Sequence, residues 1–170
     1  MSADQAWFPA AIGIGSNQQD PAKQIHRALA ALHELPDTRF MAHSASYRNP
    51  PMGPVEQPDF VNAVAVLLTR LSPRTLLEAL QSIEAAQGRE RDDVPRWGPR
   101  IIDLDILTYG QQVIRETDLE IPHSGISQRN FVLLPLREIC PFLSVPGLGS
   151  VSRLAAMIDG EALEVIPDRA

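Results

Sequence analysis

Two aspartates stand two residues apart in an otherwise apolar stretch that runs from Ile101 to Leu107. Side chains alternate between the two faces of a β-strand, so Asp103 and Asp105 are expected on one face. Their Cα atoms would lie about 6.6 Å apart at about 3.3 Å of rise per residue, which lets both carboxylates reach one cation or a pair of cations. Without a cation they would repel each other, and burial would raise the pKa of at least one. An all-oxygen pair of this kind suits Mg²⁺, which is usually held by one or two carboxylates together with phosphate oxygens.

Arginine and tryptophan directly precede the two aspartates, in the run Arg96-Trp97-Gly98-Pro99-Arg100. The planar guanidinium groups of Arg96 and Arg100 match the geometry of phosphate oxygens. Two aspartates with this spacing are common, and a nearby arginine could simply form a structural salt bridge with them. The combination with tryptophan and with apolar residues at the other positions favours a site for metal and polyphosphate.

The elements that must position these residues alternate along the chain. Apolar patterns predict strands at 8–14, 40–47, 60–68 and 101–107, with a short one near 112–114. Asp20-Pro21 and Ser72-Pro73 are typical helix starts, and they predict helices that reach Leu35 and Gln87. A further helix is expected at 132–138, and the tail after 145 is expected to form a small turn and a short helix.

A second candidate site lies at the start of the third predicted strand. Phe60 and Asn62 share a face there, which places an aromatic ring beside a carboxamide. Such a pair can stack on a flat heterocycle and form hydrogen bonds to its edge. Packing in the core is the alternative interpretation. The polar segment 88–99 has the length of a lid that closes over a ligand, although it could equally be an exposed loop.

The motif R-W-G-P-R-x-x-D-L-D-I resembles the signature of the 6-hydroxymethyl-7,8-dihydropterin pyrophosphokinase family of folate synthesis. The resemblance extends over nearly the whole chain, through Asn49-Pro50-Pro51-Met52-Gly53 and Ile121-Pro122-His123. It implies transfer of the diphosphate of ATP to the hydroxymethyl group of the dihydropterin, with release of AMP. Strand, helix, strand, strand, helix, strand is also the ferredoxin-like order. We therefore expect an α+β fold, a ferredoxin-like antiparallel sheet with helices packed on both faces, over residues 1–170 as one pyrophosphokinase domain.

The resemblance also implies roles for particular residues. The catalytic set is Arg89, Arg91, Arg100, Asp103 and Asp105, with both aspartates holding Mg²⁺, as two ions. The expected ATP-binding residues are Gln81, Glu84, Arg91, Trp97, Arg100, Ile106, His123 and Arg129, and the expected pterin-binding residues are Asn49, Pro50, Met52, Phe60, Asn62, Trp97 and Phe131. On their residue types alone, His123 and Arg129 would be interpreted as surface residues. Where relatives have a basic and an aromatic residue near the nucleotide, this chain has Asp118 and Ser124.

Composition limits the remaining possibilities. With 170 residues, 44% of them hydrophobic, the chain is expected to be a globular, cytoplasmic protein. Its net charge of −6 argues against a protein that attracts nucleic acid through a positively charged surface. No apolar run is long enough for a membrane span, and small-molecule substrates and a monomer are expected. Cys140 is expected in the core. Two rivals stay open: a Mg²⁺ phosphotransferase that passes only the γ-phosphate, and a non-catalytic module that binds nucleotide or pterin.

Overall fold

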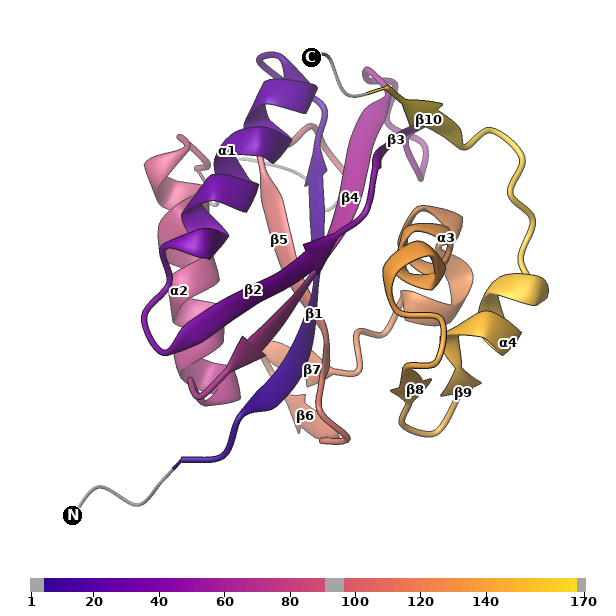
Figure 1. Cartoon of the computed structure of the whole chain (residues 1–170). Helices are drawn as coiled ribbons and strands as arrows, with labels where there is room; N and C mark the ends of the chain where they lie inside the picture. The colour runs from indigo at the N-terminus through magenta and orange to yellow at the C-terminus, as the bar shows by residue number, and fades with distance from the viewer. Residues whose placement is uncertain (1–4, 91–96, 168–170) are drawn as a thin grey trace.

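The computed structural model describes residues 5–90 and 97–167. Its centre is an antiparallel sheet in which β1 (Phe8–Ser16) pairs with β4 (Phe60–Thr69) on one side and with β5 (Asp103–Tyr109) on the other. Both β2 (Thr38–His43) and β3 (Ser46–Asn49) pair with β4, and β10 (Glu164–Ile166) pairs with β3 (Figure 1). The strand order β10-β3-β4-β1-β5, with β2 also on β4, confirms the predicted ferredoxin-like antiparallel sheet.

Two helices cover one face of this sheet, α1 (Pro21–His33) and α2 (Pro73–Ala86) (Figure 1). Both begin as predicted: the Asp20 side chain accepts a hydrogen bond from the Lys23 N–H, and the Ser72 side chain accepts one from the Thr75 N–H. Proline stands directly after each cap, where its missing N–H costs nothing. These caps explain why the helices begin at Pro21 and Pro73.

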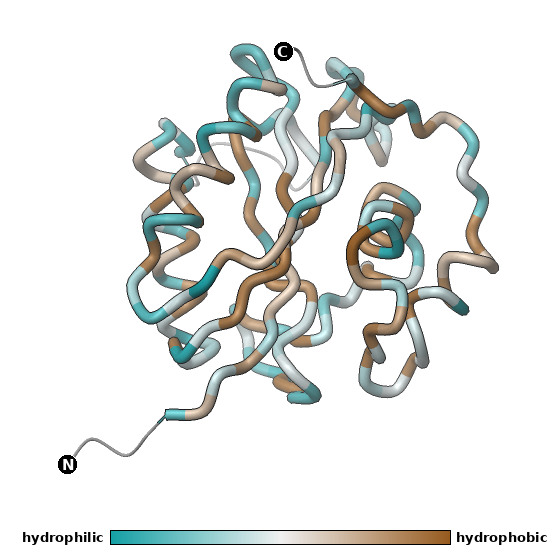
Figure 2. Tube along the Cα trace, viewed as in Figure 1, coloured by the Kyte–Doolittle hydropathy of each residue, from teal (hydrophilic) through white to brown (hydrophobic). Residues whose placement is uncertain are grey.

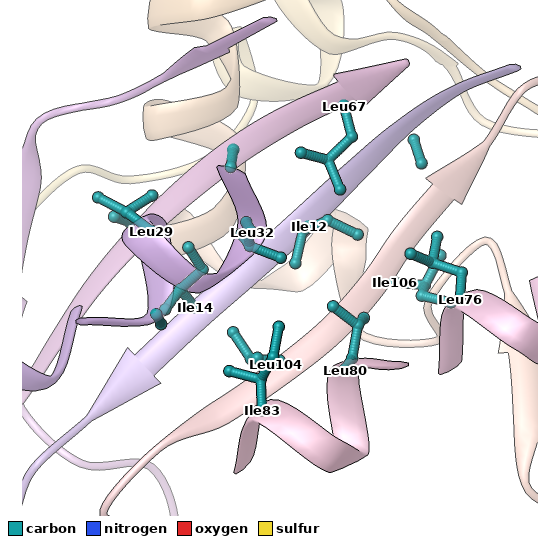
Figure 3. Close-up of a cluster of buried hydrophobic side chains, with 14 of the residues drawn as sticks. Ile12, Ile14, Leu29, Leu32, Leu67, Leu76, Leu80, Ile83, Leu104 and Ile106 are labelled. Atoms are coloured by element: carbon teal, nitrogen blue, oxygen red, sulfur yellow. The ribbon is translucent and has the colours of Figure 1, made fainter. Parts of the chain in front are cut away.

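Apolar side chains fill the space between these helices and the sheet (Figure 3). The strands contribute Ile12, Ile14, Leu67, Leu104 and Ile106, and the helices contribute Leu29, Leu32, Leu76, Leu80 and Ile83. Figure 2 shows hydrophobic residues along the central strands, whereas α1 and α2 alternate between hydrophobic and hydrophilic residues. Burial of each such side chain stabilises the fold by about 1.5–3 kcal/mol, so this face is the main source of stability.

The other face carries α3 (Asn130–Ile139) and α4 (Val151–Ala156). A second apolar cluster joins Ala11, Val64 and Leu107 of the sheet to Leu133 and Leu136 of α3. Helices therefore pack on both faces, as predicted. Smaller elements connect them: β6 (Ile114–Glu116), β7 (Leu119–Ile121), the 3-10 turn Ile126–Gln128, β8 (Ser144–Val145) and β9 (Gly149–Ser150).

A polar contact joins α3 to β3. The Tyr47 hydroxyl donates a hydrogen bond to Glu138 Oε2 at 2.6 Å, and the Ala45 N–H donates to Glu138 Oε1 at 3.1 Å. Burial, with the neighbouring Glu138 carboxylate, raises the pKa of Tyr47 to about 12. The contact holds α3 beside β3, and the start of α3 borders the cavity described below.

Several boundaries differ from the prediction. The strand expected at 40–47 is divided, because the Ser44 hydroxyl accepts from the Val64 N–H at 3.0 Å and takes the place of a backbone acceptor. The strand expected at 112–114 begins only at Ile114, and the one expected at 101–107 runs from Asp103 to Tyr109. The tail contains the expected short helix, but its last strand, β10, joins the main sheet, which the sequence did not indicate. No helix in the described part of the chain is long and apolar enough to cross a membrane.

Candidate active site

A cavity of about 360 Å³ opens on the α3 face of the sheet, where β1 ends and where β4 and β5 begin. Segments from across the chain line it: Gly13, Ile14, Gly15, Asn49, Met52, Phe60, Asn62, Ala63, Arg89, Trp97, Gly98, Arg100, Asp103, Asp105, Leu107, His123, Ser124, Arg129, Phe131 and Val132. Most of the residues that the sequence singled out are in this set. One side of the cavity carries the carboxylates and arginines, and the same cavity contains three aromatic rings.

Asp103 and Asp105 project from β5 into this cavity, whereas Leu104 and Ile106 enter the apolar core on the other face. The alternation predicted for this strand is therefore confirmed. Burial, and after it the neighbouring Asp103 carboxylate, raise the pKa of Asp105 to about 7, against the opposing effect of the guanidinium groups of Arg129, Arg89 and Arg100. A carboxylate with so high a pKa is short of positive charge, which an additional cation would supply.

Arg89 connects the carboxylates to helix α2. Its Nη1 donates to Asp103 Oδ1 at 2.6 Å, and its guanidinium also pairs with the Glu84 carboxylate. Glu84 is buried and accepts a second hydrogen bond, at 3.2 Å, from the Leu104 N–H of β5. Glu84 thus lies behind Arg89 and orients it, and does not itself line the cavity.

The structure does not bring every expected residue to the cavity. The Ile106 side chain lies in the core on the opposite face of the sheet. It therefore does not line the cavity in which ATP was expected to bind. Gln81 and Pro50 are also absent from the lining, although Pro50 follows Asn49, which is part of it. Arg91 and Arg96 lie outside the described residues.

The aromatic part of the cavity contains Phe60, Trp97 and Phe131. Asn62 lies on the same face of β4 as Phe60, as predicted, and its Nδ2 donates to Asn49 Oδ1 at 2.5 Å. The Asn62 Oδ1 faces the backbone of Gly15, where an added Cβ would lie only 2.6 Å away. A side chain at position 15 would therefore collide with the Asn62 carboxamide in the position that its hydrogen bond to Asn49 gives it.

Asn17 and Gln57 form a polar network that holds Trp97 and Arg100 in place. Asn17 exchanges two hydrogen bonds with Arg100, from its own N–H to the Arg100 carbonyl at 3.0 Å and from the Arg100 N–H to its Oδ1 at 2.8 Å. Its Nδ2 donates to Gln57 Oε1 at 2.9 Å, and Gln57 Nε2 donates to the Trp97 carbonyl at 2.5 Å. Sequence reasoning missed Gln57, because only its tertiary partners distinguish it from any other loop glutamine.

His123 and Arg129 lie at the side of the cavity formed by the segment before α3. His123 Nε2 is 3.6 Å from Asp105 Oδ2, and the Arg129 guanidinium carbon is 5.8 Å from the centre of the Phe131 ring. Burial lowers the pKa of His123, and the charge of Arg129 lowers it further. Asp118, in the turn between β6 and β7, pairs with Arg74 of α2 at 2.7 Å and does not line the cavity. Ser124 does line it.

The donor set limits the kind of metal that fits. Among the described residues there is no group of three or more histidine, cysteine, aspartate or glutamate side chains that could hold an ion. Two carboxylates on one strand, with open space in front of them, fit a hard cation that takes its remaining ligands from water and from a bound polyphosphate. They do not form the closed cage of a structural zinc site.

A ferredoxin-like sheet whose cavity joins carboxylates and arginines to aromatic rings defines a class of α+β protein suited to hold a polyphosphate beside a flat ring. Comparison with known families identifies the member of that class: the chain belongs to the 7,8-dihydro-6-hydroxymethylpterin-pyrophosphokinase family, whose model matches residues 11–141.

Individual relatives support this assignment. The chain is 46% identical over 156 residues to a 2-amino-4-hydroxy-6-hydroxymethyldihydropteridine pyrophosphokinase of Pseudomonas aeruginosa, which covers 92% of this chain and 95% of the relative. It is also 46% identical over 143 residues to the protein of the same name from Haemophilus influenzae, and the match covers 84% of this chain and 88% of the relative. The fold matches a crystal structure of a Plasmodium falciparum HPPK-DHPS chain with pterin and p-hydroxybenzoate, with a TM-score of 0.71 and 16% identity over 92% of this chain. This chain spans 44% of that longer one.

Proposed function

We propose that this chain transfers the β,γ-diphosphate of ATP to the hydroxymethyl oxygen of 6-hydroxymethyl-7,8-dihydropterin in folate biosynthesis. A bond forms between that oxygen and the β-phosphorus, the bond from the β-phosphorus to the α,β-bridging oxygen breaks, and AMP leaves. The hydroxyl proton passes to solvent. The observation that carries the proposal is the cavity itself, in which Asp103, Asp105, Arg100 and Arg129 lie beside Phe60 and Phe131 in a chain of this family.

Asp103 and Asp105 would hold Mg²⁺, as two ions, and their position on one face of β5 supports this role. When bound, the metal neutralises phosphate charge and orients the reacting oxygens. The elevated pKa of Asp105 fits a site that lacks positive charge until the metal is bound. His123 and Arg129, which lie beside Asp105, would also bind the phosphates.

The arginines would share the remaining charge of the polyphosphate. Arg89 and Arg100 line the cavity, and Glu84 holds Arg89 against Asp103, so that this guanidinium is oriented before substrate binds. Arg91 would act with them, by the family resemblance alone. Such an arrangement accelerates the reaction by positioning and by stabilising developing charge, without covalent chemistry on the protein.

The flat pterin would lie among Phe60, Trp97 and Phe131, with its edge against the Asn62 carboxamide. Ring stacking and edge hydrogen bonds then fix the hydroxymethyl group in front of the β-phosphorus. Asn49 and Met52 close the cavity next to Phe60. We further propose that residues 1–170 act as one pyrophosphokinase domain, as a cytoplasmic monomer.

The test is a product analysis. The protein is incubated with ATP, Mg²⁺ and the dihydropterin, and the nucleotides are separated by chromatography, with one control lacking the pterin and one containing EDTA. AMP that appears only with pterin and metal is the expected result. ADP would instead assign transfer of the γ-phosphate alone, and tight ligand binding without any product would assign the chain to the non-catalytic binding modules.

A further inference from the structure

We infer that Gly125 is a positioning residue for the phosphate side of the cavity. Its backbone N–H selects the tautomer of His123, and its missing side chain leaves the space that Arg129 occupies. Gly125 does not itself line the cavity. The inference rests on the proposed function only for the role of His123 and Arg129 as phosphate ligands.

The tautomer follows from one hydrogen bond. The Gly125 N–H donates to His123 Nδ1 at 3.0 Å. A ring nitrogen that accepts a hydrogen bond carries no proton, so the proton of the neutral ring is on Nε2. Nε2 is the nitrogen that faces Asp105, at 3.6 Å from Oδ2. His123 therefore presents an N–H donor to the cavity, which is the group that a phosphate oxygen requires.

The backbone around His123 keeps this arrangement in place. The His123 N–H donates to the Leu107 carbonyl at 2.9 Å, and its own carbonyl accepts from the Ile126 N–H at 3.1 Å. The histidine is thereby tied to β5 on one side and to the 3-10 turn on the other. These bonds fix the backbone of His123 relative to the turn, so the Gly125 N–H lies at a fixed position from which it reaches Nδ1.

The second constraint is steric. A Cβ added at Gly125 would lie 2.7 Å from Arg129 Nε and 3.0 Å from Arg129 Cζ. The backbone of Gly125 has φ −92° and ψ 3°, which any L-residue adopts without strain. A side chain at this position would therefore displace the Arg129 guanidinium, whereas the turn itself would accept any residue. Replacement by alanine is a clean test, since it adds one methyl group and leaves the backbone donor to His123 intact.

The tautomer is tested by NMR on protein labelled with ¹⁵N in histidine, with His123→Gln to assign the signals among the four histidines. We expect the Nε2–H form of His123, seen as ring nitrogen shifts and couplings in which Nδ1 is the unprotonated nitrogen. A predominant Nδ1–H form would overturn the inference. This measurement needs no substrate, so it is independent of whether the proposed reaction occurs.

The steric constraint is tested by a double-mutant cycle on Gly125→Ala and Arg129→Ala, with the Kd for ATP in the presence of Mg²⁺ measured by calorimetry. Gly125→Ala should weaken ATP binding about tenfold, because one charge-assisted contact is displaced. In the Arg129→Ala background the same change should have no effect. Thermal unfolding of Gly125→Ala should stay close to wild type, because the atoms that must move belong to a flexible side chain.

Gly160→Ala is the matched control, because its added Cβ would also crowd a flexible side chain, 3.1 Å from Leu134 Cδ1, outside the cavity lining. It should leave ATP binding unchanged. The inference is contradicted if Gly125→Ala binds ATP as the wild type does, or if it weakens binding equally with and without Arg129. If ATP binding follows the cycle but AMP is never formed, the proposed reaction fails while the positioning role stands.

Discussion

The two faces of the sheet are built from the same strands but have opposite chemistry. On the α1 and α2 face, residues such as Leu80 and Ile106 form a continuous apolar core. On the α3 face, a smaller core adjoins a cavity that contains Asp103 and Asp105. Successive residues of strand β5 alternate between the apolar core and the cavity. The difference shows how a fold can place two carboxylates together without weakening the layer that stabilises it.

The two faces are in contact at Glu84. This carboxylate is buried on α2, yet it binds Arg89 of the cavity and the Leu104 N–H of the strand between them. A buried charge is tolerated only with partners that satisfy it. Glu84 therefore connects helix α2, on the apolar face, to Arg89 of the cavity. Mutations on each face test whether the two faces otherwise act separately.

The largest effect is expected from Asp105→Asn. Turnover should fall about a thousandfold or more, because several kcal/mol of transition-state charge stabilisation depend on the proposed metal ligand. The thermal unfolding temperature should not fall, because the substitution removes a carboxylate that burial disfavours. Steady-state kinetics and calorimetric unfolding provide the two readings, with the exposed Glu78→Gln of α2 as the matched control. A variant that lost both activity and stability would undermine the division.

Leu80→Ala addresses the opposite face. Leu80 is fully buried, so its truncation should lower the free energy of unfolding by about 2–5 kcal/mol. The KM and kcat of the folded fraction should stay at wild-type values, because Leu80 does not line the cavity. Urea unfolding measures the first quantity, and Leu148→Ala, at a site 44% exposed, is the control that should change neither.

Phe60→Ala should act on one substrate. Loss of the ring should raise the KM for the pterin about tenfold while the KM for ATP changes little, since aromatic stacking contributes roughly 0.5–1.5 kcal/mol beyond the buried area. Phe142→Ala, at a ring that is 92% exposed, should leave both values unchanged. An equal rise in both KM values for Phe60→Ala would show that the cavity is not divided between pterin and nucleotide as proposed.

The last prediction is a dependence of stability on pH. The pKa of Asp105 rises from its usual 3.8 to about 7 in the folded chain, so the folded state binds more protons than the unfolded state between these values. In EDTA, the free energy of unfolding should therefore fall as the pH rises from about 4 to about 7. Asp105→Asn should flatten this slope, as measured by urea unfolding across the range. An unchanged slope would mean that Asp105 is not the group responsible.

Local patterns were sufficient to predict much of this structure. The alternation in β5, the caps of α1 and α2 and the shared face of Phe60 and Asn62 all depend on neighbours in sequence. A strand of ten residues such as β4 carries a clear pattern. A strand of three residues such as β10 is too short to carry one, so its pairing with β3 could not be foreseen.

The parts of the site that depend on tertiary partners were harder to predict. His123 and Arg129 appear on residue type alone as surface residues, and only the family resemblance placed them near phosphate. Gln57 and Gly125 had no signal in the sequence, because their importance lies in a carbonyl or a side chain that the fold brings to them. The division of a strand at Ser44 likewise depends on a hydroxyl that reaches the Val64 N–H of another strand.

An alanine scan of β5 from Asp103 to Leu107, read by turnover and by thermal unfolding, tests the division of the sheet most directly. Replacement of Asp103 or Asp105 should abolish turnover in protein that remains folded. Replacement of Leu104 or Ile106 should lower the free energy of unfolding by about 2–5 kcal/mol and leave the turnover of folded molecules intact. Turnover of Asp105→Ala within tenfold of wild type, or an equal loss of turnover at Leu104 and Ile106 in fully folded protein, would contradict it.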